Sequence, residues 1–214
     1  VLRSGETVAS RLDATATTAD ELVHLMSGTK TVEGRRAGCQ GTDVVLETPL
    51  FTLHAGEVVG LAGLEGQGQE EFLTSLRGAE AAGPVAYVPR ERRAEGIFEQ
   101  LSIAENFALP TLARDTTVGV IRSRRTAARL AAHGERLRLK MGRGSDAITT
   151  LSGGNQQKVI ISRALADNPT VLLLNDPTRG IDQNAKNDIY TLIGDLLRRG
   201  LGVVLLSTEV DELV

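Results

Sequence analysis

The chain has 214 residues, of which 41% are hydrophobic and 24% charged, with a formal net charge of −3 and a single cysteine, Cys39. This length allows one sizeable hydrophobic core and a small additional piece, and the composition is that of an ordinary folded domain. The charge gives no indication of nucleic-acid binding, one cysteine excludes an internal disulfide, and no apolar run approaches the roughly 20 residues of a membrane-spanning helix.

The first 42 residues predict a small unit followed by a linker. Residues 1–10 alternate as in a short strand or hairpin. Residues 17–28 follow as a short helix that ends at Gly28. Polar residues and glycines make 30–42 the best linker candidate.

From Asp43 onward, strand and helix patterns alternate. The expected strands are rich in Val and Leu and lie at residues 44–53, 57–63, 84–89, 170–175 and 202–207. The expected helices lie at residues 69–77, over most of 102–150 with 122–139 as the clearest stretch, after "LSGGNQQK" to about 166, and at 184–199. Continuous apolar strands that alternate with helices are typical of a mainly parallel α/β sheet.

Three glycines, Gly63, Gly66 and Gly68, lie between an expected strand and an expected helix in the stretch "GLEGQGQEE". In that context glycines allow backbone N–H groups to converge on a phosphate, and the start of the helix adds the positive end of its dipole. A phosphate-binding loop continues with a lysine for the phosphates and a hydroxyl for Mg²⁺, but Gln69 and Glu70 stand there. The alternative is a tight strand-to-helix turn without a ligand.

The stretch "TVLLLNDPTRGID" places Asn175 and Asp176 directly after a buried strand. In a phosphate-loop ATPase the first of these positions is an Asp that holds Mg²⁺. The next is often a Glu that polarises the attacking water. Asn175 brings no charge, and Asp176 keeps a carboxylate that is one methylene shorter. Without the other motifs, the alternative is a strand followed by an Asx turn.

The string "LSGGNQQK", from Leu151 to Lys158, opens a helix with Ser152, Gly153 and Gly154. A hydroxyl and backbone N–H groups would therefore point outward toward an anion. As a bare helix cap, Ser-Gly-Gly would be unremarkable. The whole string resembles the signature motif of ATP-binding cassette (ABC) ATPases. Its Asn155 form, together with "PTRGID" and "GLEGQGQ", is similar to the tandem ABC subunits of simple-sugar and nucleoside importers.

This resemblance implies a P-loop NTPase core of the ABC type, with a mainly parallel sheet, an antiparallel β portion and a helical signature subdomain at about 102–155. It also implies that residues 1–29 are the closing strand and helix of a preceding cassette, that 30–42 are a linker, and that 43–214 are the second cassette. The chain begins at Val1 without Met and ends in "STEVDELV". We therefore expect a fragment of a longer protein, cut before the last strands of its cassette.

In ABC proteins two cassettes dimerise head to tail, and each ATP, with Mg²⁺, lies between the phosphate loop of one and the signature of the other. The resemblance thus assigns Ser152, Gly153, Gly154 and Gln156 to the ATP of the partner cassette. It leaves the chain's own site degenerate, because the expected catalytic and metal groups are missing. The residues at those positions are Gln69, Glu70, Arg90 in place of a phosphate-sensing Gln, Asn175 at the Mg²⁺ position, the shortened Asp176, and Glu209 in place of the switch His.

The partners implied by the resemblance are the first cassette, transmembrane permease subunits at the cytoplasmic face of the cell membrane and, indirectly, a periplasmic or extracellular substrate-binding protein. Arg90, Arg92 and Arg93 lie in the loop that would face the permease. Three alternatives remain open: an active ATPase that works as a homodimer, an interaction domain without nucleotide, and an ABC protein of DNA repair or translation. The last usually carries long coiled-coil or basic inserts, and none fits between Leu101 and Thr150, so we expect no nucleic-acid partner.

Overall fold

A computed structural model of the chain describes residues 2–3, 6–7, 41–62, 66–117, 120–121 and 123–208. The strands β1 (Leu2–Arg3) and β2 (Glu6–Thr7) pair in antiparallel fashion, which agrees with the hairpin expected near the start of the chain. The expected helix at 17–28, the linker up to residue 40, Gly63 and Glu209 lie outside the described residues.

A four-stranded parallel sheet forms the centre of the fold. Its strands are β5 (Val58–Leu61), β10 (Gly202–Leu206), β9 (Val171–Asn175) and β6 (Val85–Val88), in that spatial order. All three neighbouring pairs are parallel, as the alternating sequence pattern predicted. Every residue of β9 and β10 is buried, because both faces of the sheet are covered.

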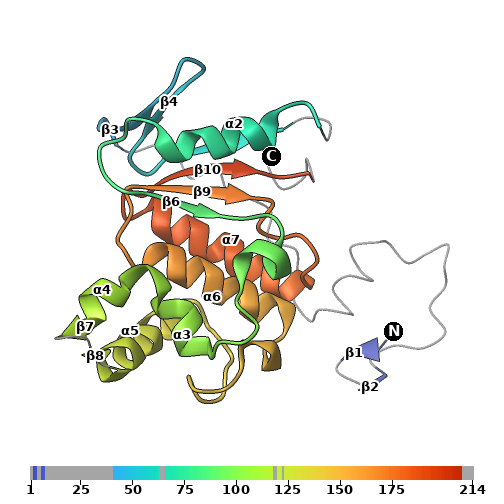
Figure 1. Ribbon diagram of the computed structural model, residues 1–214. Coiled ribbons are helices and arrows are strands. Elements are labelled where there is room, and N and C mark those ends of the chain that lie inside the picture. The colour runs from blue at the N-terminus through green and yellow to red at the C-terminus, as the bar shows by residue number, and fades with distance from the viewer. Residues whose placement is uncertain are drawn as a thin grey trace.

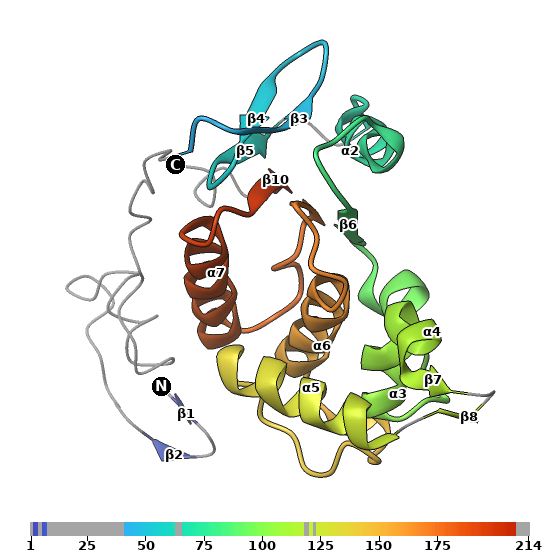
Figure 2. The same ribbon diagram turned by 90° about the vertical axis from the view of Figure 1, so that its left-hand side faces the viewer.

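One face of the sheet is covered by α2 (Gln69–Ser75), which continues into a 3₁₀ turn at Leu76–Gly78, together with the antiparallel pair of β3 (Val44–Glu47) and β4 (Thr52–His54). The other face is covered by α6 (Gly153–Leu165) and α7 (Gln183–Leu197). Figures 1 and 2 show these layers above and below the strands. Each layer has its own hydrophobic cluster, so the sheet is the common wall between two cores.

The segment between residues 102 and 152 folds as a mainly helical unit, as expected. It contains α3 (Ile103–Ala108), α4 (Leu112–Asp115), α5 (Ser123–Arg136) and 3₁₀ turns at Leu109–Thr111 and Ile148–Thr150. Ile103, Phe107 and Ile148 are fully buried in the cluster that includes α6. No helix in the described part of the chain is both long and apolar enough to cross a membrane.

Two local features differ from the sequence-based expectations. A short hairpin of β7 (Thr116–Thr117) and β8 (Val120–Ile121) interrupts the predicted helical segment. Its residues are β-branched, and such side chains favour extended backbone. In addition, Arg92–Gly96, which we expected as an irregular loop, forms a π-helical turn. Gly96 allows this turn to approach α6, since a Cβ there would lie 2.6 Å from Ile160 Cδ1.

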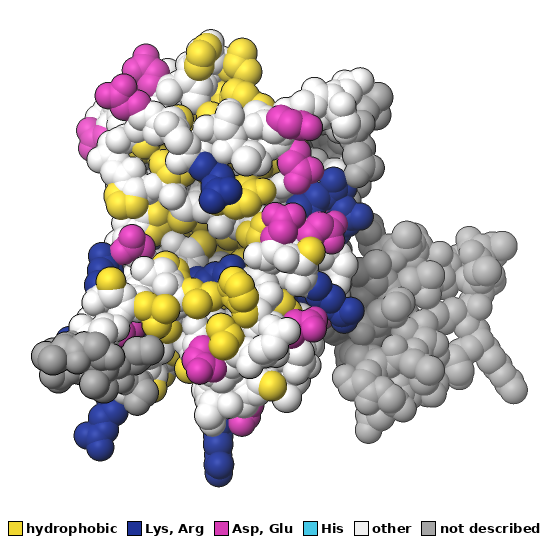
Figure 3. Space-filling view, in the orientation of Figure 1, with side chains coloured by type: hydrophobic (Ala, Val, Ile, Leu, Met, Phe, Trp, Pro, Cys, Tyr) yellow, Lys and Arg dark blue, Asp and Glu magenta, His cyan; other side chains and the backbone are white. Residues whose placement is uncertain are grey.

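The edge strand β6 faces the viewer in Figure 1, and Figure 3 shows hydrophobic side chains gathered across the middle of this same face. Val85, Ala86 and Tyr87 of β6 are partly exposed, whereas the next two strands of the sheet, β9 and β10, are buried. The carboxyl ends of β5, β9 and β10 lie in register, with Leu206 paired to both Leu61 and Asn175. The polar residues that follow these strands are therefore brought to one edge of the sheet.

Candidate functional site

The glycine loop keeps the backbone of a phosphate-binding turn. Gly66 and Gly68 have φ of 81° and 93°, in the left-handed region that side chains other than glycine rarely adopt. Gly68 is the N-cap residue of α2, and no side chain caps the helix there. The turn before α2 thus has the glycine backbone conformations that a phosphate-binding loop requires.

Glu70 and Asn175 contact each other directly. Asn175 ends β9 and is completely buried, and its Nδ2 donates to Glu70 Oε1 at 2.8 Å and to the Tyr87 hydroxyl at 3.0 Å. In the resemblance, the first of these positions holds a Mg²⁺-binding hydroxyl and the second a Mg²⁺-binding Asp. Here the two side chains make a hydrogen bond to each other.

Arg90 lies between two carboxylates of the same site. Its Nη1 is 3.6 Å from Glu70 Oε2, and its Nε is 3.8 Å from Asp176 Oδ2. Thr208 Oγ1 also donates to Asp176 Oδ2, at 3.1 Å. The Asp176 backbone is left-handed, with φ of 47°, and its N–H donates to Leu206 O at 2.8 Å. In this conformation the Asp176 carboxylate points toward Arg90.

The cavity at this site has a volume of about 70 Å³. Its described lining includes Gly66, Gln69, Glu70, Arg90, Asn175 and Asp176. Pockets that enclose a ligand of drug size are on the order of 300–1,000 Å³. The described residues of this chain alone therefore do not enclose a ligand of that size.

The donor set does not fit a Mg²⁺ ion. Oxygen ligands are present, but Glu70 already accepts from Asn175 and lies near Arg90. No group of three His, Cys, Asp or Glu side chains in the described part of the chain is arranged to hold a metal ion. A guanidinium among the carboxylates supplies the positive charge that a metal would otherwise bring. The described residues of this site therefore support no metal-dependent step.

The signature segment forms the start of α6. Ser152 is exposed and is the N-cap residue, with Gly153 and Gly154 in the first turn. A Cβ on Gly154 would lie 2.4 Å from Ala185 Cβ on α7, so this glycine is required for close helix packing. A Cβ on Gly153 would lie 2.9 Å from Arg92 Nη2. The two glycines therefore lie against different neighbours.

Gln156, which is buried, and Arg92, which is partly buried, contact each other. Arg92 Nε donates to Gln156 Oε1 at 3.2 Å, and Gln156 Nε2 donates to Ile148 O at 3.3 Å. Burial, followed by the positive charge of Arg93, lowers the pKa of Arg92. Of the three arginines expected to face a permease, Arg90 and Arg92 make internal contacts and Arg93 is exposed.

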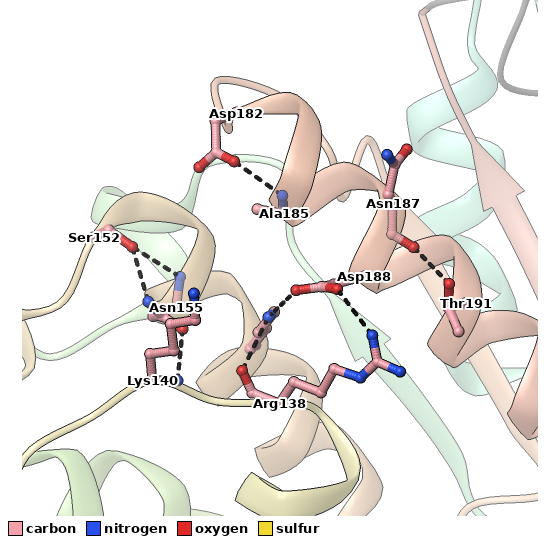
Figure 4. Close-up of polar contacts among 10 residues, drawn as sticks. Arg138, Lys140, Ser152, Asn155, Asp182, Ala185, Asn187, Asp188 and Thr191 are labelled. Atoms are coloured by element: carbon pink, nitrogen blue, oxygen red, sulfur yellow. Dashed lines mark hydrogen bonds and ion pairs between the residues drawn. The ribbon is translucent and has the colours of Figure 1, made fainter. Parts of the chain in front are cut away.

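Two contacts of the signature helix were not expected from the sequence, and Figure 4 labels the partners Arg138, Lys140 and Asp188. Lys158 is buried, and its Nζ lies 2.6 Å from Asp188 Oδ2 on α7 and 3.3 Å from Arg138 O. The Asn155 side chain bonds to Ser152 and to the backbone N–H of Lys140. The sequence did contain a hint of the Lys158 contact, because this lysine lies on the face of the helix that packs into the core.

Comparison with known proteins gives a consistent result. A family profile described as ABC transporter matches residues 46–179. A ribose import ATP-binding protein of Burkholderia pseudomallei is 36% identical in an alignment of 184 positions that covers 76% of this chain and 36% of the relative. A ribose import ATP-binding protein of Rubrobacter xylanophilus is 37% identical, and a xylose import ATP-binding protein of Photobacterium profundum is 33% identical. Both alignments cover 100% of this chain, with 48% and 50% of the respective relatives.

The chain thus spans between about a third and a half of the length of these relatives. Among solved structures, the dimeric bacterial ABC transporter cassette MJ0796 has a TM-score of 0.62 at 22% identity. The match covers 75% of this chain and 78% of the MJ0796 chain. A post-hydrolysis state of that cassette, bound to ADP and Pi, has a TM-score of 0.63 at 21% identity, with the same coverage. These structures share the fold, and the profile match over more than half of the residues shows that the chain belongs to the ABC transporter family.

Proposed function

We propose that this chain is the ATP-binding, energy-coupling domain of an ABC importer of simple sugars. The relatives are named for ribose and xylose import, which supports this substrate class. In this proposal the chain acts at the cytoplasmic face of the membrane, against transmembrane permease subunits that receive their substrate from a binding protein.

We further propose the second-cassette position, with residues 1–29 as the end of a first cassette, 30–42 as the linker and 43–214 as the cassette itself. The alignment of the whole chain to about half of two relatives supports a tandem arrangement. The partner of this cassette is then the first cassette of the same protein.

The chain's own ATP site is, in this proposal, inactive. The observation that carries it is the contact between Glu70, Asn175 and Arg90 at the position where the family holds Mg²⁺ and the phosphates. Gln69 brings no charge in place of the loop lysine. An incoming phosphate would have to separate the Glu70 carboxylate from its two partners and would then be repelled by it.

The signature, in contrast, keeps the groups that an anion needs. Ser152 is exposed, and the backbone N–H groups of Gly153 and Gly154 lie in the first turn of a 13-residue helix. Donors in such a turn favour negative charge. We infer that these groups contact the γ-phosphate of ATP in the first cassette. In this proposal the lysine and the Mg²⁺ ligands of that site belong to the first cassette.

The test is the substrate-stimulated ATPase activity of the assembled transporter with changes in this cassette. Gly153→Asp places a side chain and a negative charge where the backbone must approach phosphate, and losing one positioned donor typically costs about 10²–10³ in rate. Glu70→Gln is the matched control, because it changes charge at the site we propose is inactive and should alter the rate far less.

Melting temperatures of both variants separate misfolding from loss of function, which matters because a side chain at Gly153 displaces the Arg92 guanidinium. A neutral Gly153→Asp together with an inactive Glu70→Gln would reverse the roles of the two half-sites.

An interaction domain without nucleotide is the second candidate, and the hydrogen bond between Asn175 and Glu70 in the chain's own site favours it. Titration of the chain with labelled ATP distinguishes the two. Weak binding is expected if the loop still accepts nucleotide, and no binding if the chain is an interaction domain without nucleotide.

A further inference from the structure

Two helices of the chain begin with a serine in nearly the same conformation. Ser152 has φ of −62° and ψ of 158°, and Ser102 has φ of −66° and ψ of 168°. Each hydroxyl accepts from the backbone N–H three residues later, at 3.5 Å from Asn155 N and 3.2 Å from Glu105 N. The two caps differ in the side chain at that third position, which is an amide in one and a carboxylate in the other.

At Ser102 the hydroxyl proton is used inside the chain. Glu105 Oε2 accepts from the Ser102 hydroxyl at 2.6 Å and from the Ser102 N–H at 2.8 Å. The hydrogen bond from the Ser102 side chain, followed by the one from its backbone, lowers the pKa of Glu105 and keeps this group ionised. A carboxylate only accepts, so the Ser102 hydroxyl must donate to it.

At Ser152 the hydrogen-bond direction is the opposite. The backbone N–H of Lys140 donates to Asn155 Oδ1 at 3.0 Å. Because a backbone N–H can only donate, the atom that faces it must be the amide oxygen, and this fixes the orientation of the Asn155 amide. Asn155 Nδ2 then faces Ser152 Oγ at 3.0 Å and can only donate to it (Figure 4). With the Asn155 backbone N–H as a second donor, both acceptor positions of the hydroxyl are filled.

We propose that Asn155 is a positioning residue that makes the Ser152 hydroxyl a hydrogen-bond donor to an oxyanion outside the chain. Ser152 is exposed, so its proton is directed to solvent or to a ligand. This inference rests on the proposed function, in which that oxyanion is the γ-phosphate of ATP in the partner cassette. It also makes the Lys140 backbone part of the signature, because its N–H holds the amide in place.

Asn155→Asp tests this direction with almost no change of shape. One carboxylate oxygen still accepts from Lys140 N–H, and the other accepts the Ser152 proton, as Glu105 does at Ser102. In the full transporter we expect the ATPase rate to fall by about 10²–10³, as for the loss of a positioned donor, with the melting temperature unchanged.

A double-mutant cycle with Ser152→Ala separates hydroxyl orientation from simple charge repulsion. If Asn155 acts through the hydroxyl, Asn155→Asp has little further effect once Ser152 is Ala. An equal loss in both backgrounds would overturn the inference, since the added charge would then act by itself. If Asn155→Asp does not fold, the same cycle with Asn155→Ala applies, with a smaller expected loss that also disappears in the Ser152→Ala background.

The outcomes also distinguish this inference from the proposed function. A neutral Ser152→Ala would contradict the proposed function itself. A damaging Ser152→Ala with a neutral Asn155→Asp would leave that function standing and overturn the role of Asn155. Ser102→Ala is the matched control for a lost serine cap, and it should lower the melting temperature without a comparable loss of ATPase rate.

Discussion

Glu70 shows at the residue scale why several departures from the family pattern occur together. Its carboxylate lies 2.8 Å from Asn175 Nδ2 and 3.6 Å from Arg90 Nη1. An Asp at position 175 would place two carboxylates at hydrogen-bond distance, and one of them would have to bind a proton. The amide at 175 and the guanidinium at 90 are therefore compatible with Glu70.

Restoring the loop residues should restore nucleotide binding but not turnover. Gln69→Lys with Glu70→Ser adds a charged contact and removes a repulsive one. Hydrogen bonds to charged groups contribute about 1.5–3 kcal/mol, so we expect ATP affinity to rise by roughly one to two decades. Calorimetric titration with Mg²⁺ and ATP measures this. Robust ATP hydrolysis by the double variant would show that Asn175 is not a defect.

At the scale of elements, the packing of α6 on α7 places the signature. Gly154 allows the close approach, and the Lys158–Asp188 ion pair joins the two helices one turn further along. Lys158 is 5% exposed, whereas Asp188 is 31% exposed and also lies near Arg138. The position of the first turn of α6 thus depends on its packing against α7, and not only on residues that would contact a phosphate.

Gly154→Ala should destabilise the chain although alanine favours helices. The added Cβ would lie 2.4 Å from Ala185 Cβ, and overpacking of this kind costs about 1–3 kcal/mol. Urea denaturation gives the free energy of unfolding. Gly78→Ala is the control, because no heavy atom lies within 4 Å of its added Cβ. Equal stability of the two variants would mean that α6 moves away from α7 at little cost.

At the scale of the whole molecule, the helical unit meets the core around His133. A cavity of about 370 Å³ between α5, α6 and α7 includes His133, Leu165 and Leu192 in its lining. The His133 ring packs on Phe107, with centroids 5.4 Å apart. Burial, followed by the charge of Arg129, lowers the pKa of His133.

The folding stability of the chain should therefore depend on pH, because His133 at this junction is less easily protonated in the folded state. The neutral ring is favoured in the folded state, so its contribution is fully present above the unfolded pKa of about 6.5 and is lost as pH falls through the lower folded value. Thermal unfolding between about pH 7 and pH 5 measures this loss. In His133→Gln the decline should be smaller, and an unchanged slope would remove His133 as its cause.

The sequence by itself determined the main architecture. Continuous apolar runs such as "TVLLLN" and "GVVLLS" become buried parallel strands because only a sheet covered on both faces hides every side chain of such a run. The string "LSGGNQQK" located the start of α6, since a Ser-Gly-Gly cap is a local property of the chain. The hairpin at 116–121 was missed, because two short β-branched pairs carry little signal.

The tertiary structure alone decided how the side chains of the candidate site are paired. Glu70 and Asn175 are 105 positions apart in sequence, and their contact exists only because β9 ends beside the start of α2. In the same way, Gln156 faces inward to Arg92, and Asn155 is oriented by the Lys140 backbone. Sequence periodicity shows which face of an element is buried, but the partner of a polar side chain depends on which distant segments the fold brings within hydrogen-bond distance.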